Sequence, residues 1–138
     1  MCLYKILGNF HNSKIQTYVR NFGLQREIQK KDKKFAVAII LFYAKYCKQT
    51  EELRIIGKQL LRSGTSVASN FRAVTRGRSH PERFSKMCIV VEEIDETQFW
   101  FELIEVANLL EPSTYDSIKN EIDELVKIFT SSKANMKK

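Results

Sequence analysis

Apolar side chains recur at alternating steps of three and four residues in several stretches of the chain, which is the spacing of one helix face. The first stretch predicts a helix from about Gln25 or Asp32 to Lys48, and the last predicts one near the C-terminus. We call the line of apolar residues on one helix face its seam. The seam of the first helix is Phe35, Ile39, Phe42 and Tyr46, and the seam of the last helix is Tyr115, Ile118, Ile122, Leu125 and Phe129. The chain has only five glycines and two prolines, so the pattern predicts an all-α bundle of four helices.

The second predicted helix, Leu53 to Thr75, has two contrasting faces. Its apolar seam consists of Leu53, Gly57, Leu60, Gly64, Val67, Phe71 and Val74. Gly57 and Gly64 lie on this seam and indicate a close approach of a neighbouring helix. The opposite face carries five basic residues without an interleaved acid: Arg54, Lys58, Arg62, Arg72 and Arg76. This face is either a solvated helix surface or a surface that binds phosphates or an acidic partner.

The segment that follows predicts a tight hairpin between two helices. Gly77 suits a left-handed position after the end of the second helix. Ser79 and Glu82 have the spacing of a capping box, with Pro81 in the first turn of the next helix. Further basic residues gather at this corner: Arg76, Arg78, Arg83 and Lys86.

The third predicted helix, His80 to Leu110, is apolar on more than one side. Its main stripe is expected to contain Phe84, Met87, Cys88, Val91 and Ile94. The adjacent aromatic residues Phe99, Trp100 and Phe101 are separated by about 100° each and cannot all face one core. The sequence therefore predicts a contact surface between subunits at these three residues. The alternative is that one of the rings covers the end of the bundle.

Charge divides the chain into a basic and an acidic half. Residues 54–86 contain eight basic residues against one acid and residues 87–126 contain eleven acids against one base, within a net charge of +7. The carboxylates of the third helix include Glu92, Glu93, Asp95 and Glu96. They lack the E-x-x-H partners of a di-metal bundle, so salt bridges to the second helix are expected. Neither a metal nor another cofactor is predicted.

The remaining features concern location and boundaries. Three widely spaced cysteines indicate reduced thiols in a cytoplasmic protein. The longest apolar run, residues 35–44, is too short to span a bilayer, so no membrane partner is expected. Residues 1–24 are predicted to be an N-terminal extension, residues 25–131 the bundle and residues 132–138 a basic tail. The extension is either a short docked appendage or a loose basic arm.

Two motifs resemble a known family. The segment RSGTSVASN at residues 62–70 contains Ser66 and Asn70, and Glu92, Glu96, Thr97 and Trp100 match an E-x-x-x-E-T-x-x-W pattern. In order and spacing they resemble the bacterial four-helix bundle proteins encoded in intervening sequences of 23S ribosomal RNA genes. This family is similar to the accessory protein of diversity-generating retroelements. Many members carry an acidic residue after the Asn, whereas here Arg72 follows Asn70 and Phe71, which makes the surface more basic.

The resemblance has specific implications for fold and function. It implies an up-down-up-down antiparallel bundle in a bacterial protein, assembly into a homopentamer and no catalysis. For the retroelement relatives it implies contact with reverse transcriptase and nucleic acid through a basic surface. No small-molecule substrate is expected.

The sequence leaves three functions open. The first is an oligomeric scaffold for RNA, DNA or a nucleic-acid-bound protein, with these binding residues: Lys58, Arg62, Arg72, Arg76, Arg78, Arg83 and Lys86. The second is a structural homo-oligomer whose charges pair internally. The third is a HEPN-type nuclease, whose motif has four to six residues between an Arg and a His. This class is disfavoured because only three residues separate Arg76 from His80.

Overall fold

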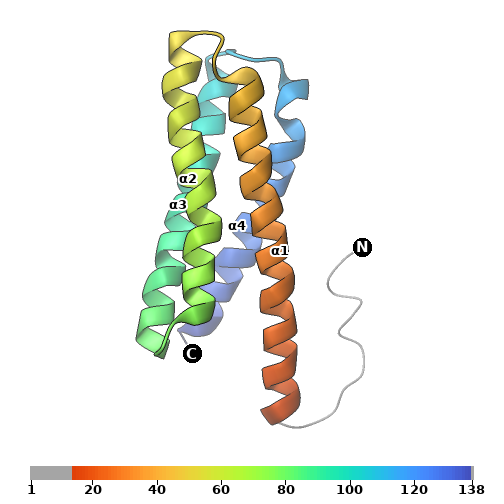
Figure 1. Ribbon diagram of the computed structural model, residues 1–138, viewed down its shortest axis with the longest axis vertical. Helices are drawn as coiled ribbons and strands as arrows, with labels where there is room; N and C mark the ends of the chain where they lie inside the picture. Colours follow the sequence, from red (N-terminus) through yellow and green to blue (C-terminus); the bar gives the residue numbers. More distant parts are fainter. Residues whose placement is uncertain (1–13, 138) are drawn as a thin grey trace.

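The computed structural model describes residues 14–137, and these form four α-helices and one short 3₁₀ helix without a strand. The helices are α1 (Lys14–Tyr46), α2 (Glu51–Arg76), α3 (His80–Val106) and α4 (Asp116–Met136), with η2 (Pro112–Thr114) before the last. Successive helices run in alternating directions (Figure 1). The all-α, up-down-up-down bundle is therefore confirmed.

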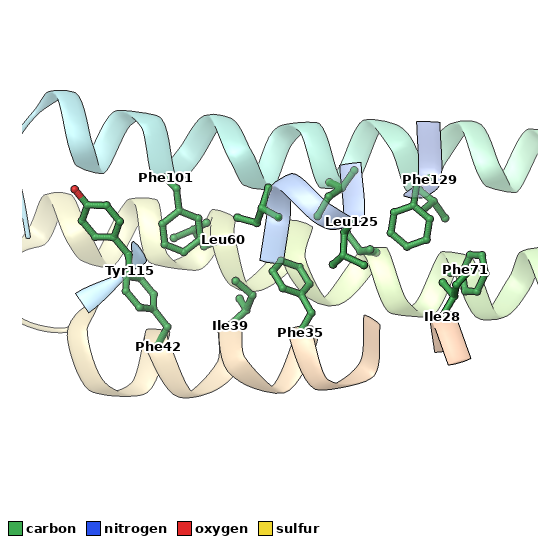
Figure 2. Close-up of a cluster of buried hydrophobic side chains, with 14 of the residues drawn as sticks. Ile28, Phe35, Ile39, Phe42, Leu60, Phe71, Phe101, Tyr115, Leu125 and Phe129 are labelled. Carbon is green, nitrogen blue, oxygen red and sulfur yellow. The ribbon is translucent and has the colours of Figure 1, made fainter. Parts of the chain in front are cut away.

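Large apolar side chains from all four helices form one continuous core. Phe42 of α1 packs against Phe101 of α3, with 5.1 Å between ring centroids, and Phe101 also contacts Tyr115 before α4. Phe71 and Phe129 pack at 5.3 Å further along the bundle. Figure 2 shows these two aromatic groups with Ile39, Leu60 and Leu125 between them. The core thus extends along the bundle from Phe42 to Phe71.

The seam of α2 is buried at every predicted position. The residues at or below 4% exposure include Leu53, Leu60, Val67, Phe71 and Val74, and both seam glycines are buried. A Cβ atom at Gly57 would lie 2.9 Å from Cδ2 of Tyr43, and one at Gly64 would lie 2.8 Å from Cγ1 of Ile39. The predicted close approach of a neighbouring helix is therefore confirmed, and that helix is α1, which lies near enough to α2 to exclude a methyl group.

The first helix begins earlier than the sequence pattern predicted. α1 starts at Lys14, not near Gln25 or Asp32, and continues through Asn21 and Gly23. An isolated glycine costs a helix only about 1 kcal/mol relative to alanine, which is too little to end it. The predictions for residues 1–13 lie outside the described residues. At the other end of the chain, α4 continues to Met136, into the segment predicted as a tail.

The left-handed residue that was predicted after α2 is found after α3 instead. Gly77 has φ −60° and ψ 137°, so the predicted left-handed conformation is wrong. A Cβ atom at Gly77 would instead collide with Cγ of Arg83, so the glycine provides space in the hairpin. The left-handed residue is Asn108, with φ 52°, after α3. It lies in a Schellman motif, because Leu109 N donates to Ile104 O and Asn108 N donates to Glu105 O.

The N-terminal caps of α2 and α3 are the residues expected from the sequence pattern, Thr50 and Ser79. Leu53 N donates to Thr50 Oγ1 at 3.3 Å, and Glu82 N donates to Ser79 Oγ at 3.2 Å. The carboxylate of Glu82 accepts a hydrogen bond from Arg78 N at 2.9 Å rather than from Ser79 N. The predicted hairpin is thus fixed by a cap one residue wider than the usual capping box.

The core face of α3 differs from the predicted stripe. Its buried residues are Met87, Val90, Ile94, Thr97, Phe101 and Ile104. Phe84, Cys88 and Val91 are only partly buried, so three members of the predicted stripe do not lie at its centre. Because α3 is apolar on several sides, its periodicity could not identify the inner face. Within residues 14–137, no helix combines the length and apolar composition needed to cross a bilayer.

Candidate nucleic-acid interface

The basic residues of α2 divide into paired and unpaired side chains. Arg62 bridges to the acidic helix, since its guanidinium is 3.6 Å from Glu93 and also pairs with Glu96. The hydrogen bond from Arg62 lowers the pKa of Glu96, whereas burial raises the pKa of Glu93. Arg54 pairs with Glu51 at 2.6 Å in its own helix. The expected salt bridges between α2 and α3 therefore occur at Glu93 and Glu96, and they neutralise Arg62.

Four arginines near the hairpin retain unpaired charge. Arg72, Arg76, Arg78 and Arg83 are all exposed. None of them forms an ion pair with a carboxylate within the described part of the chain. Like charges held together and exposed in this way produce a positive potential that attracts anions. This end of the bundle is therefore the strongest candidate for binding phosphate.

A groove between α1 and α2 collects several of these cations. Its volume is about 570 Å³. Arg72 and Arg76 of α2 and Arg83 of α3 contribute to its lining, and α1 contributes Arg26 and Lys33. The other lining residues are Asn21, Phe22, Gln25, Gln29, Asp32, Ala68 and Thr75. In Figure 1 the N-terminal end of α1 extends beyond the α2–α3 connection at this end of the bundle.

A buried carboxylate lies among these cations. Asp32 is only 2% exposed, and its Oδ2 atom has no hydrogen-bond partner. Burial raises the pKa of Asp32 to about 7, although a backbone hydrogen bond and the charge of Lys33 both oppose the rise. Nearby, Gln29 Nε2 donates to Thr75 Oγ1 at 2.7 Å and joins α1 to α2. The groove thus contains one acceptor that the described residues do not satisfy.

The polar motif residues of α2 and α3 mainly support the bundle. The hydroxyls of Ser63 and Thr97 share a buried hydrogen bond of 2.9 Å across the two helices. Asn70 Nδ2 donates to Ser66 O at 2.9 Å within α2. Thr97 also donates to the carbonyl oxygen of Glu93, at 2.7 Å. The described residues contain no group of three His, Cys, Asp or Glu side chains suited to a metal ion.

Comparison with known proteins identifies the family. The model for the 23S rRNA-intervening sequence protein matches residues 25–131. The chain belongs to this family. A similar protein of known structure, from the S23 ribosomal protein family of Bacteroides thetaiotaomicron, is described as having unknown function. Its crystal structure has a TM-score of 0.73 and 30% identity, over 80% of this chain and 97% of that one. Among curated proteins, none matches the chain.

The intervening-sequence motif residues occupy different environments in this chain. Thr97 is fully buried and Glu96 is partly buried, whereas Glu92 is exposed. Trp100 Nε1 donates to Glu96 Oε1 at 3.1 Å. Glu96 therefore accepts from both Arg62 of α2 and Trp100 of its own helix. Two members of the second motif join α3 to α2, namely Glu96 through Arg62 and Thr97 through Ser63.

The predicted subunit contact is partly wrong in this intervening-sequence protein. Phe101 has no exposed surface, because its ring fills the core between Phe42 and Tyr115, and it cannot form a contact between chains. Phe99 is 47% exposed and packs edge-on against the partly buried Trp100 at 5.3 Å. Of the three predicted contact residues, only Phe99 and Trp100 have side-chain surface that another subunit could contact.

The basic residues that were predicted to bind nucleic acid do not all lie together in the structure. Arg72, Arg76 and Arg83 meet in the groove, and Arg78 and Lys86 belong to the nearby hairpin and first turns of α3. Lys58 lies fourteen residues before Arg72 in α2, a separation of about 21 Å along the axis. Arg26, Lys33, Phe22 and Asp32 were missed as site residues. The sequence carries a sign for three of them, because Arg26 and Lys33 belong to a basic N-terminal segment and Asp32 is a charged residue at seam spacing between Ile28 and Phe35.

Proposed function

We propose that this chain is a non-enzymatic binding protein whose basic end contacts RNA, DNA or a nucleic-acid-bound partner such as a reverse transcriptase. The observation that carries the proposal is the group of arginines at the groove and hairpin, Arg72, Arg76, Arg78 and Arg83, which lack carboxylate partners among the described residues. Phosphate backbones gain affinity from such groups by releasing counterions. The family description, which refers to ribosomal RNA, is compatible with this partner class.

Reversing one of these charges provides the test. Arg72→Glu is expected to weaken binding to RNA about tenfold and to lower the slope of log K against log salt concentration by about one or more. The control is Arg54→Glu, which makes the same change in charge at the opposite end of α2, where the arginine is already paired with Glu51. Binding is measured by fluorescence anisotropy over a range of salt concentrations. A wild-type chain that binds neither RNA nor DNA at low salt contradicts the proposal.

A homo-oligomer is proposed as the assembled form, with the pentamer implied by the family resemblance. Large apolar side chains are exposed on the outer side of α1, where Leu41 is 63% and Val37 is 50% exposed. Ile55 of α2 is 56% exposed as well. Leu41→Glu is expected to shift the mass measured by light scattering toward the monomer, because a buried charge without a partner is costly. Val106→Glu, at an exposed site at the end of α3, is the control, and a mass independent of both changes opposes this surface.

The structural alternative is a homo-oligomer without a nucleic-acid ligand. It is favoured by the charges that already pair between helices, including Arg62 with Glu93, Lys31 with Glu124, and Lys119 with Glu105. These pairs leave the arginines of the groove unexplained. The salt titration separates the two functions, because a purely structural oligomer binds nucleic acid at no salt concentration.

A further inference from the structure

We propose that the groove between α1 and α2 binds one unpaired nucleotide of a nucleic-acid strand and selects a base that carries an exocyclic amino group. In this arrangement Asp32 accepts a hydrogen bond from the amino group, the arginines hold the flanking phosphates, and Phe22 contacts the base. The inference rests on the proposed function, whose binding surface it makes more specific.

Asp32 requires a donor that the described chain does not supply. An ionised carboxylate only accepts hydrogen bonds, and Oδ2 of Asp32 is buried without a partner. Buried polar atoms are paired in the great majority of cases, so an orphan acceptor is a specific feature to be explained. Because Asp32 lines the groove, a molecule in the groove is the nearest source of a donor.

The charge of the walls restricts what that molecule can be. Five cationic side chains line the same groove, namely Arg26, Lys33, Arg72, Arg76 and Arg83. A metal ion or a basic peptide would offer Asp32 a positive partner but would be repelled by these walls. A free phosphate would suit the walls, but its own negative charge would be repelled by the ionised carboxylate of Asp32 at close range. A nucleotide combines a donor on its base with negative charge on its phosphates.

The size and the aromatic lining of the groove also fit a nucleotide. A volume of about 570 Å³ lies in the usual range of small-molecule sites. Phe22 contributes to the lining and is 55% exposed, so its ring is free to contact a base. Proteins that bind single strands commonly combine a basic groove with aromatic side chains on which unpaired bases stack. Gln25 and Gln29 add amide groups along the same wall of α1.

Cytosine and uracil provide a matched pair of ligands for the test. Cytosine has an amino group at the position where uracil has a carbonyl oxygen, and the two bases are otherwise similar in shape. A carboxylate accepts from the amino group of cytosine, whereas it repels the carbonyl oxygen of uracil. The full-length chain is therefore expected to bind oligocytidine about tenfold more tightly than oligouridine of equal length at the same salt concentration.

The experiment measures both oligonucleotides by fluorescence anisotropy at about pH 8, above the raised pKa of Asp32. Asp32→Asn replaces one acceptor by a donor and is expected to reduce the preference for cytosine to less than about twofold. Phe22→Ala and Arg72→Glu are expected to weaken the binding of both oligonucleotides and to retain the preference for cytosine, because neither side chain contacts the amino group.

The outcomes separate the subsite from the general function. If the wild-type chain binds both oligonucleotides equally, or if Asp32→Asn keeps the preference for cytosine, the subsite is overturned and the basic interface stands. If neither oligonucleotide binds, both proposals fail. A preference for cytosine that disappears only in Asp32→Asn supports the subsite.

Discussion

Asp32→Asn is expected to raise the free energy of unfolding by about 3 kcal/mol at about pH 8 and to change it little at about pH 4. The carboxyl group of Asp32 has a pKa near 7 in the folded chain, against an ordinary value of 3.8. Between these two values the unfolded chain has lost this proton while the folded chain keeps it. Stability is therefore lost as pH rises toward 7, because the ionised group is more stable in the unfolded chain.

Urea denaturation at several pH values checks this prediction. The difference between wild type and Asp32→Asn isolates Asp32, since all other titrating groups are common to both chains. Asp95→Asn serves as the control because Asp95 is exposed and its replacement reports the loss of a negative charge alone. Curves for wild type and Asp32→Asn that remain parallel across this pH range would refute the assignment of a buried, unsatisfied carboxylate.

Gly57→Ala is expected to destabilise the fold by about 1–3 kcal/mol even though alanine favours helices. The added methyl group would lie 2.9 Å from both Cδ2 of Tyr43 and Sγ of Cys47, and it would collide with Cβ of Cys47. Cys47 is fully buried at the end of α1, so relief of the contact requires α1 and α2 to separate.

Gly23→Ala provides the opposite control for this substitution. Gly23 lies in the N-terminal third of α1 and has nothing within 4 Å of an added methyl group. The same replacement there is expected to stabilise the fold by up to about 1 kcal/mol. Both variants are compared by thermal and urea denaturation. Stabilisation by both would mean that the helices adapt to the extra volume at Gly57.

The sequence identifies those parts of the fold in which apolar and polar faces are distinct. On α2 a single line of apolar residues faces a basic stripe, and every predicted seam position is buried. On α4, Ile122, Leu125 and Phe129 are buried as predicted, and Ile118 is partly buried. On α3 the pattern fails because apolar residues surround the helix, and the hydroxyl of Thr97 enters the core where it meets Ser63.

The candidate site was less accessible from sequence because it joins distant segments. Arg72 and Arg76 could be found on one helix face, but their proximity to Arg26 depends on how α1 passes α2. The pairing of Arg62 with Glu96 likewise depends on the rotation of α3. The sequence pattern offers Asp32 only as a possible start of the first helix, whereas its position between Ile28 and Phe35 places it on the buried side of α1.

The early start of α1 affects how firmly the groove is held. Residues 21–24 are all exposed, and Ile28 is the first buried side chain of residues 21–28. A helical segment with no buried side chain is only marginally stable, so residues 21–27 are expected to unfold locally at a lower free energy than residues 28–46 of α1, with faster amide hydrogen exchange. A ligand in the groove is therefore expected to stabilise the part of its wall that residues 21–27 form. Such a ligand loses affinity to the entropy of ordering that wall, and in return the groove can adjust its width to bases of different size.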